Sequence, residues 1–443
     1  MMRRIAVILV LAAGVCLFSF AAAGPVQAGE MDILVNKLVE KGILTRAEAE
    51  ALITEMRAEA ERTKSTEPEP APQPGQETSP GAAPQTAKAA AVEEAKNANA
   101  DLPAWVRKMT VKGDVRLRYQ NDDTQGDFQS PRGRERARFR IGADVEVAEH
   151  WKVGFGLTTG SADPRSANQT FQQTFETPDI RLDYAYAQYQ PWQFLKFIGG
   201  KQKNQLWRPK DMMWDTDIRP EGITAPFNTK LDGVELFGLP AFYRLAEFKS
   251  NNDDSYMWLV NAGADFKFSK NMNLKVAATY FDFANMKGNS FKWSSGTNST
   301  DAAGNLIYNY DSFTADGEFS IRFPGPVPYA AAFGQYVYAI EPEHDNQGWL
   351  AGIKFGHRRL NKFAQWQVKY NYRRFERDAW PDFFPDKDFA GGGTNAKGHE
   401  VEAYFGLSKN ISLKFDYYFE VKPIKEEEFG KQKLIQVDLL LKF

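Results

Sequence analysis

The sequence is almost free of cysteine. Its single cysteine, Cys16, lies within an apolar leader of the 443-residue chain. Removal of that leader would leave a mature chain without a thiol, which excludes thiol catalysis and cysteine-ligated metal sites and suits an oxidising envelope compartment. Because Val15 is a poor match to the small residue that precedes a lipidated cysteine, we do not expect lipidation.

Long apolar runs and an excess of one charge are also missing. After residue 29 no uninterrupted apolar run approaches the roughly 20 residues of a transmembrane helix, so any membrane-spanning part must consist of strands. The net charge is only −2 at pH 7, which gives no electrostatic support for a nucleic-acid partner.

The first 28 residues have the composition of a secretory signal. Arg3 and Arg4 precede an apolar stretch from Ile5 to Ala23, and residues 26–28 supply the small residues of a cleavage site. The alternative is an uncleaved anchor helix, because the apolar stretch is about long enough to span a membrane. We predict a cleaved signal peptide over residues 1–28, because the stretch is rich in alanine and the cleavage site follows closely.

Two further zones precede residue 105. Residues 29–64 show helical periodicity, and Thr45 with Glu48 forms a capping box for a second helix. We predict a coiled-coil-like periplasmic segment, which is either a simple hairpin or a self-association element because so short a pair buries little surface. Residues 65–104 are rich in proline and alanine, with no aromatic residue between 65 and 100, and are predicted to be a disordered linker.

From residue 105 to the C-terminus apolar and polar residues alternate. In residues 411–421 every odd position is apolar or aromatic and most even positions are polar. Strands of soluble proteins have about 5–6 residues, whereas these segments have roughly 10–14, which is enough to cross a bilayer at a tilt. Aromatic residues make up 14% of the chain, as a lipid-facing wall with aromatic girdles requires. The predicted fold class is an all-β, antiparallel transmembrane β-barrel over residues 105–443.

Sixteen strands are predicted, joined alternately by short and long connections. Short turns at one end and long loops at the other are typical of outer-membrane barrels, with the short turns in the periplasm. The short turns include Leu239-Pro240, and the long loops are 160–178, 204–228, 284–309 and 376–397. The strands are predicted at residues 109–120, 133–147, 151–159, 179–190, 194–203, 229–238, 241–249, 255–268, 272–283, 310–323, 327–340, 347–357, 362–375, 398–408, 411–422 and 433–443.

The last predicted strand ends on an aromatic residue. Alternate positions of residues 433–443 are mostly apolar, and Phe443 is the last of them. This pattern resembles the signal that the outer-membrane barrel-assembly machinery reads, so we predict that Phe443 serves as that signal.

Four segments carry a resemblance to a known family, and their order along the chain is more specific than any one of them. They are VNKLVEKGILTRAEAEAL (35–52), VKGDVRLRYQ (111–120), RERARFRIGADV (134–145) and IGGKQKNQLWRP (198–209). The chain resembles the family of putative porins of Gram-negative bacteria, which is distantly similar to the phosphate- and pyrophosphate-selective porins. The resemblance implies a trimeric, sixteen-stranded channel and leaves the permeant solute open.

Six arginines of the first two strands are expected to line the pore. On the lipid face each would cost roughly 2–4 kcal/mol at the membrane midplane. They could form a path for anions, or an ordinary wall that acids such as Asp114, Asp144 and Glu146 balance. Because basic residues exceed acidic ones by only two over residues 105–443, we expect at most a weak anion preference. The predicted basic ladder consists of Arg116, Arg118, Arg134, Arg136, Arg138 and Arg140.

The loop 204–228 is the third long loop and, by analogy with general porins, is expected to fold into the lumen and constrict it. The alternative is a surface loop of mixed charge, although Trp207 and the run Met212 to Trp214 favour packing against another part of the chain. The constriction residues are predicted to be Arg208, Lys210, Asp211, Asp215, Asp217, Arg219 and Glu221.

Enzymatic and metal-dependent functions have weak support. The four histidines, His150, His344, His357 and His399, lie in connections or at strand ends without a nucleophile motif. The acidic runs Asp122-Asp123-Asp127 and Asn251 to Asp254 could hold Ca²⁺, but such runs are usually only solvated. We therefore predict no catalytic residue, no cofactor and no metal.

The sequence predicts an outer-membrane porin for passive diffusion of small hydrophilic solutes or ions. The alternative is a structural barrel whose N-terminal extension tethers the outer membrane to peptidoglycan or to a periplasmic partner. The partners expected are outer-membrane lipid and lipopolysaccharide, the barrel-assembly machinery, two further copies in a homotrimer, and small solutes or anions.

Overall fold

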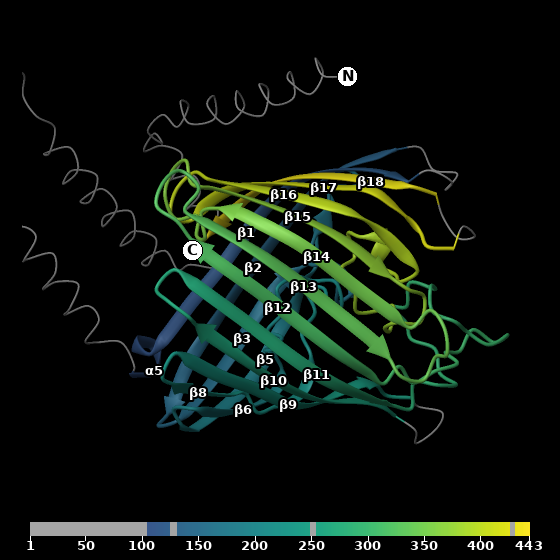
Figure 1. Cartoon of the computed structure of the whole chain (residues 1–443), viewed down its shortest axis with the longest axis horizontal. Helices are drawn as coiled ribbons and strands as arrows, with labels where there is room; N and C mark the ends of the chain where they lie inside the picture. The colour runs from purple at the N-terminus through teal and green to yellow at the C-terminus, as the bar shows by residue number, and fades with distance from the viewer. Residues whose placement is uncertain (1–103, 125–130, 249–253, 426–429) are drawn as a thin grey trace, which may run out of the picture. The chain divides into compact units, whose positions relative to one another are not determined.

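The computed structural model describes residues 104–124, 131–248, 254–425 and 430–443 (Figure 1). The signal peptide predicted over 1–28, the helical segment over 29–64 and almost all of the linker over 65–104 lie outside these residues and stay predictions. Residue 104 itself begins the short helix α5 (Ala104–Arg107), which precedes the first strand. Among the described residues no helix is long and apolar enough to cross a membrane.

The described strands close into one antiparallel barrel. Each wall strand pairs with its neighbours along the chain, and β1 closes the sheet by pairing with both β2 and β18. The wall strands are β1 (Met109–Thr124), β2 (Arg132–Ala148), β3 (Trp151–Thr159), β5 (Ile180–Trp192), β6 (Leu195–Lys201), β7 (Glu221–Thr224) with β8 (Phe227–Leu231), β9 (Val234–Ala246), β10 (Ser255–Lys267), β11 (Met272–Ala284), β12 (Ser312–Arg322), β13 (Tyr329–Ala339), β14 (Gln347–Gly356), β15 (Trp366–Phe375), β16 (Ala396–Gly406), β17 (Ile411–Pro423) and β18 (Gln432–Lys442).

The predicted sixteen-stranded antiparallel barrel is confirmed. β7 and β8 both pair with β6 and β9 and together make one interrupted wall strand, so sixteen wall strands are formed. The two-residue strand β4 (Gln169–Thr170) belongs to the long loop after β3 and pairs with β2. The barrel closes at the C-terminus, where Phe443 and Gly113 exchange two backbone hydrogen bonds of 3.0 and 3.1 Å.

The predicted boundaries of the sixth and seventh strands are wrong. The turn lies at Asp232-Gly233, where Gly233 has a φ of +71°, and β9 runs straight through Leu239-Pro240. The carbonyl of Pro240 accepts a hydrogen bond of 3.0 Å from Ala225, in the gap between β7 and β8. The N and C=O of one strand residue point to the same neighbour, so the proline nitrogen faces the interruption, where a donor is not needed.

The two faces of the wall have different surroundings. On β10, Met257 and Leu259 are 0% and 3% exposed, whereas Trp258 and Val260 are 56% and 60% exposed. Because alternate side chains of a strand point to opposite faces, the exposed apolar set forms the outer face, as in a barrel that is surrounded by lipid.

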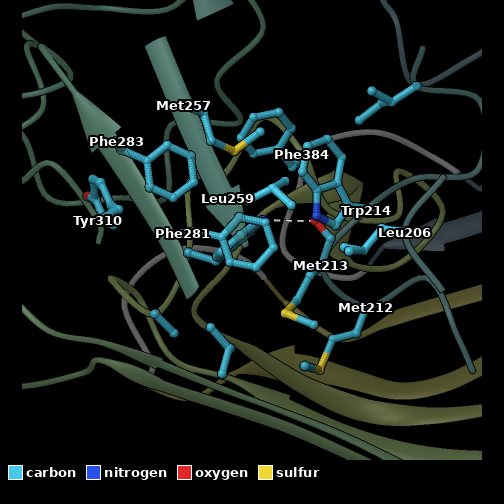
Figure 2. Close-up of a cluster of buried hydrophobic side chains, with 14 of the residues drawn as sticks. Leu206, Met212, Met213, Trp214, Met257, Leu259, Phe281, Phe283, Tyr310 and Phe384 are labelled. Carbon is cyan, nitrogen blue, oxygen red and sulfur yellow. Dashed lines mark hydrogen bonds between the residues drawn. The ribbon is translucent and has the colours of Figure 1, made fainter. Parts of the chain in front are cut away.

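Three long loops fold into the barrel and build an apolar core there. They are residues 202–220, 285–311 and 376–395, which lie between β6 and β7, β11 and β12, and β15 and β16. Figure 2 shows Met213 and Trp214 of the first loop against Phe281 and Leu259 on the inner face of the wall. The core therefore fills part of the lumen and leaves the remainder to polar residues.

Candidate functional site: a charged passage through the barrel

The six arginines of the predicted ladder lie side by side on β1 and β2. The strand register places Arg116 opposite Arg138, Arg118 opposite Arg136, and Asp114 opposite Arg140. Arg116 donates a hydrogen bond of 2.5 Å to Asn168 of the loop after β3, and the other guanidinium groups contact side chains of the inward loops or of neighbouring inner-face positions. All six therefore point to the inside of the barrel, because those partners lie there.

Three arginines of the ladder, Arg118, Arg138 and Arg140, are closely paired with acids. Asp114 accepts hydrogen bonds from Arg138 at 2.7 Å and from Arg140 at 2.8 Å. Asp217 of the loop 202–220 lies 3.1 Å from Arg140 and 3.6 Å from Arg138. On the other side of β1, the guanidinium group of Arg118 forms a bidentate ion pair with Asp438 of β18, with hydrogen bonds of 2.6 and 2.8 Å.

The other two arginines of β2, Arg134 and Arg136, are less well neutralised. Arg134 lies 3.7 Å from Asp122, whereas Arg136, within the described part of the chain, donates hydrogen bonds only to the uncharged Gln120 and Ser166. The Nε atoms of Arg116, Arg134 and Arg136 are buried and have no hydrogen-bond partner among the described residues. Positive charge therefore remains available at Arg134 and Arg136.

Acidic side chains of two loops face the ladder across a cavity of about 300 Å³. Asp215 and Asp217 come from the loop 202–220, and Asp386 and Asp388 come from the loop 376–395. Asp388 lies 3.2 Å from Arg118, which joins the second loop to the ladder. The cavity therefore has a basic wall on one side and acidic loop segments on the other.

The acids of these loops differ in their pKa values. Burial raises the pKa of Asp217, but the attraction of Arg138 and Arg140 outweighs burial and leaves that pKa below its usual range. Burial also raises the pKa of Asp215, and the nearby carboxylates of Asp217 and Asp386 raise it further. The two aspartates, only two residues apart, are thus placed in opposite electrostatic surroundings.

The loop 202–220 contacts three separate parts of the inner wall. Lys210 binds Glu400 at 2.7 Å and Glu402 at 3.3 Å on β16, while Asp217 binds the ladder on β2. Arg219 lies 3.1 Å from Asp183 on β5. Asp211 lies 3.1 Å from Lys210, and Arg208 donates to the carbonyl of Leu206 at 3.5 Å. The loop therefore extends across the lumen from β5 to β16.

Glu221 does not belong to this loop. The loop ends at Pro220, and Glu221 is the first residue of β7, where its exposed side chain binds Lys201 of β6 at 2.6 Å. It shares the outer face with Ile223, because the two residues are two positions apart on the same strand. The structure thus excludes Glu221 from the constriction, since the strand begins seven residues earlier than 228, the end predicted for the loop.

Several residues of the passage could not be assigned to it from the sequence alone. Asp386 and Asp388 lie in a loop whose sequence has no periodic pattern to show which way its side chains point. Asp438 contacts the ladder only because β18 pairs with β1. Arg165 of the loop after β3 is buried and donates to the carbonyls of Trp293, Asp382 and Gly392. Arg165 therefore ties three long loops together around the passage.

Two groups of carboxylates in the passage have the spacing of metal ligands. They are Asp211 with Asp386 and Glu400, and Glu400 with Glu402 and Asp416. Basic side chains already occupy both groups, because Lys210 contacts Glu400 and Glu402, and Lys414 contacts Asp416 at 2.6 Å. Of the calcium candidates, Asp122 lies near Arg134 and Asp254 binds Arg244, while Asp127 and residues 251–253 lie outside the described residues.

The histidines lie away from the passage. His150 is in the turn after β2 beside Glu149, and His344 and His357 lie in connections between strands. His399 of β16 receives or donates a hydrogen bond of 2.8 Å with Tyr370 and stacks on Phe419. Its ring belongs to an aromatic cluster of the wall.

The β2 and loop residues of the passage lie within the part of the chain that a family model matches, whereas Asp114, Arg116 and Arg118 of β1 precede that part. The model of the family described as "Putative porin" matches residues 123–323 and 300–443. No curated protein matches the chain.

Several solved structures are similar to this chain. OprB of Pseudomonas putida is similar with a TM-score of 0.51 and 10% identity, over 76% of this chain and 94% of that one. OmpF of Salmonella typhi has a TM-score of 0.45 and 12% identity, over 76% of this chain and 97% of that one. DcaP of Acinetobacter baumannii, an outer-membrane channel, has a TM-score of 0.43 and 12% identity with the same coverage. At these identities the similarity to OprB shows the barrel fold.

Proposed function

The chain belongs to the family described as "Putative porin" and is an outer-membrane channel for passive diffusion, and from this premise we propose that its passage has a weak preference for anions. The observation that carries the proposal is the unequal neutralisation of the ladder. Among the described residues, Arg136 has only uncharged hydrogen-bond partners and Arg134 has one distant acid, while Arg138 and Arg140 are paired closely. A guanidinium without a carboxylate partner attracts a passing anion more strongly than one that is already paired.

The acidic loops keep this preference small. Asp217 and Asp388 lie directly against Arg140 and Arg118, so much of the basic charge is balanced within the cavity. The barrel sequence agrees, because its basic residues exceed its acidic ones by only two. A strongly selective anion filter would leave more of its cations unpaired.

The reversal potential of single channels under a salt gradient tests the proposal. The wild-type channel is expected to show a reversal potential of the anion-selective sign, and Arg134→Gln with Arg136→Gln is expected to move it toward zero. Lys409→Gln is the matched control, because Lys409 is an exposed lysine in the turn between β16 and β17. A cation-selective sign in the wild type, or an equal shift in the control, contradicts the proposal.

The homotrimer is the second part of the proposal. It rests on the resemblance to trimeric porins that the sequence motifs carry. The mass of the protein–detergent complex, corrected for bound detergent by multi-angle light scattering, measures the oligomeric state. A mass of three chains is expected, and a monomeric mass at channel-forming concentrations contradicts it.

A further inference from the structure

A second cavity lies beside the apolar core and apart from the charged passage. It has a volume of about 500 Å³, which is within the usual range of small-molecule sites. Its lining residues come from β6, β7, β9 and β10 and from four long loops, those after β3, β6, β11 and β15. It is therefore at the end of the barrel that carries the long loops, which is the extracellular end of an outer-membrane barrel.

Aromatic rings form much of the lining of this cavity. Phe291 and Phe383 stack with their centroids 4.8 Å apart, and Phe248 meets Phe291 edge-on at 6.0 Å. Trp214 and Trp293 complete one side of the lining. Phe291 and Trp293 are only half-buried, although they pack against the buried core. Such a surface is suited to the flat face of an aromatic ligand.

Two polar groups of the lining residues are left without partners. The hydroxyl of Tyr243 and the indole N–H of Trp214 are buried, and neither has a hydrogen-bond partner among the described residues. Buried tyrosine and tryptophan side chains usually find a partner for these groups, because an unmade hydrogen bond is costly. Both groups can donate, and an acceptor oxygen would satisfy them only after a side-chain movement that exposes them to the cavity.

Lys292 supplies a cation beside the aromatic rings. Of the other charged residues around the cavity, Lys201 pairs with Glu221 on the outer face, Arg219 with Asp183 and Arg244 with Asp254, which leaves Lys292 and Glu247. Lys292 is exposed, lies 5.0 Å from the centre of the Trp293 ring, and forms no ion pair with a described residue. Its ammonium group is therefore free to meet a carboxylate beside the aromatic rings.

We propose that this cavity binds small aromatic carboxylates. The ring of the ligand lies among Phe291, Phe383 and Trp293, and its carboxylate faces Lys292. The proposal goes beyond the weak anion preference of the charged passage, since it concerns a different cavity and a ligand that is recognised by its ring as well as its charge. The loop 202–220 contributes Trp214 and Arg219 to this cavity and Asp215 and Asp217 to the charged passage.

Binding of benzoate to the purified full-length chain in detergent tests the proposal, measured by titration calorimetry and by the change in tryptophan fluorescence. Saturable binding is expected for benzoate, weaker binding for the neutral benzyl alcohol, and none for acetate at the same concentrations. Glucose is included because sugars also stack on aromatic rings. Binding of glucose as tight as that of benzoate, or no saturable binding of benzoate, overturns the proposal.

Substitutions separate the ring from the charge. Phe291→Ala is expected to weaken benzoate and benzyl alcohol alike by about tenfold, which corresponds to about 1.4 kcal/mol. Lys292→Gln is expected to weaken benzoate about threefold to tenfold and to leave benzyl alcohol unchanged. Tyr329→Phe is the matched control, because Tyr329 bonds Glu318 on another part of the inner wall. Equal loss of benzoate binding in the control, or unchanged binding in Phe291→Ala, contradicts the assignment.

The same preparations distinguish this proposal from the anion preference. Reversal potentials without benzoate are expected to be unchanged in Phe291→Ala, because that residue lies outside the charged passage. Benzoate binding with no anion preference would reject only the proposed function. Anion preference without benzoate binding would reject only the aromatic site.

Discussion

The inner wall of the barrel has two halves of different chemistry. On β9, β10, β11, β13 and β14 and at the end of β15, many inward positions carry apolar side chains such as Tyr243, Met257, Phe281 and Val337, all buried beneath the inward loops. On β1, β2 and β16 to β18 many inward positions carry charges, and Arg118, Glu400 and Asp438 are each paired with an opposite charge. The halves use the same strand geometry and differ in what covers them.

The difference shows how loop packing shapes the lumen. Apolar inward side chains would face water in an empty barrel, at a cost of about 25 cal/mol per Å² of apolar surface, so the loops that carry Trp214 and Trp380 cover them. Charged inward side chains are costly to dehydrate, so they hold the loops by ion pairs and leave hydrated space between them. The passage is therefore confined to the charged half.

The largest effect is expected when the apolar half loses its central ring. Trp380 is fully buried, lies 4.8 Å from Phe281 and donates to the carbonyl of Met213 at 2.9 Å. Trp380→Ala is expected to lower the free energy of unfolding by about 3–5 kcal/mol because it leaves a large cavity. Conductance is expected to rise as the loops leave the lumen. Thermal unfolding and single-channel recordings measure both effects, with the outward Trp349→Ala as control.

A slightly smaller effect is expected in the charged half. Lys210→Met would remove the buried ammonium group that binds Glu400 and Glu402, leaving acids with one cation fewer. The expected loss is about 3 kcal/mol, at the low end for a broken buried pair, because Arg373 and Lys414 still contact these acids. The control is Lys201→Met, whose pair with Glu221 is exposed. Equal losses of unfolding free energy in the two variants would contradict the prediction that Lys210 anchors its loop through buried ion pairs.

The charged half is also expected to respond to pH. Burial, with Asp217 and Asp386, raises the pKa of Asp215, and burial with Asp211 raises that of Asp386, although Arg373 opposes the latter shift. Below the raised pKa values both carboxyls are neutral, and each gains a negative charge as the pH rises through its pKa. Anion preference is therefore expected to decrease with rising pH.

Reversal potentials across the pH range measure this response. Asp215→Asn combined with Asp386→Asn is expected to remove the pH-dependent part of the anion preference. Asp301→Asn changes an exposed loop carboxylate and serves as the control. A wild-type preference that increases with pH would show that other groups dominate the passage.

The smallest effect is expected outside both halves. Glu221→Gln would break only the exposed contact with Lys201 on the outer face. Exposed ion pairs contribute about 0–1 kcal/mol, so stability is expected to change by less than that amount. The reversal potential is expected to stay constant, and a measurable shift would show that Glu221 does act on ions in the passage.

The sequence by itself determined the barrel and the inward direction of the arginine ladder. Period-two alternation needs only neighbouring residues, so fourteen of the sixteen strands were located close to their observed ends. The same rule could not locate the turn before β9, because proline is typical of turns and Leu239-Pro240 therefore resembles one. Pro240 is tolerated inside β9 because its nitrogen faces the gap between β7 and β8. That information lies in the pairing of strands rather than in β9.

Only the tertiary structure decided which charges meet and where the open space lies. Arg118 finds Asp438 because the last strand closes on the first, and Asp388 reaches the same arginine because its loop turns inward. These residues are about 270 to 320 positions away from Arg118 along the chain. A local pattern cannot encode such contacts, because they depend on closure of the whole barrel and on the loops that pack inside it.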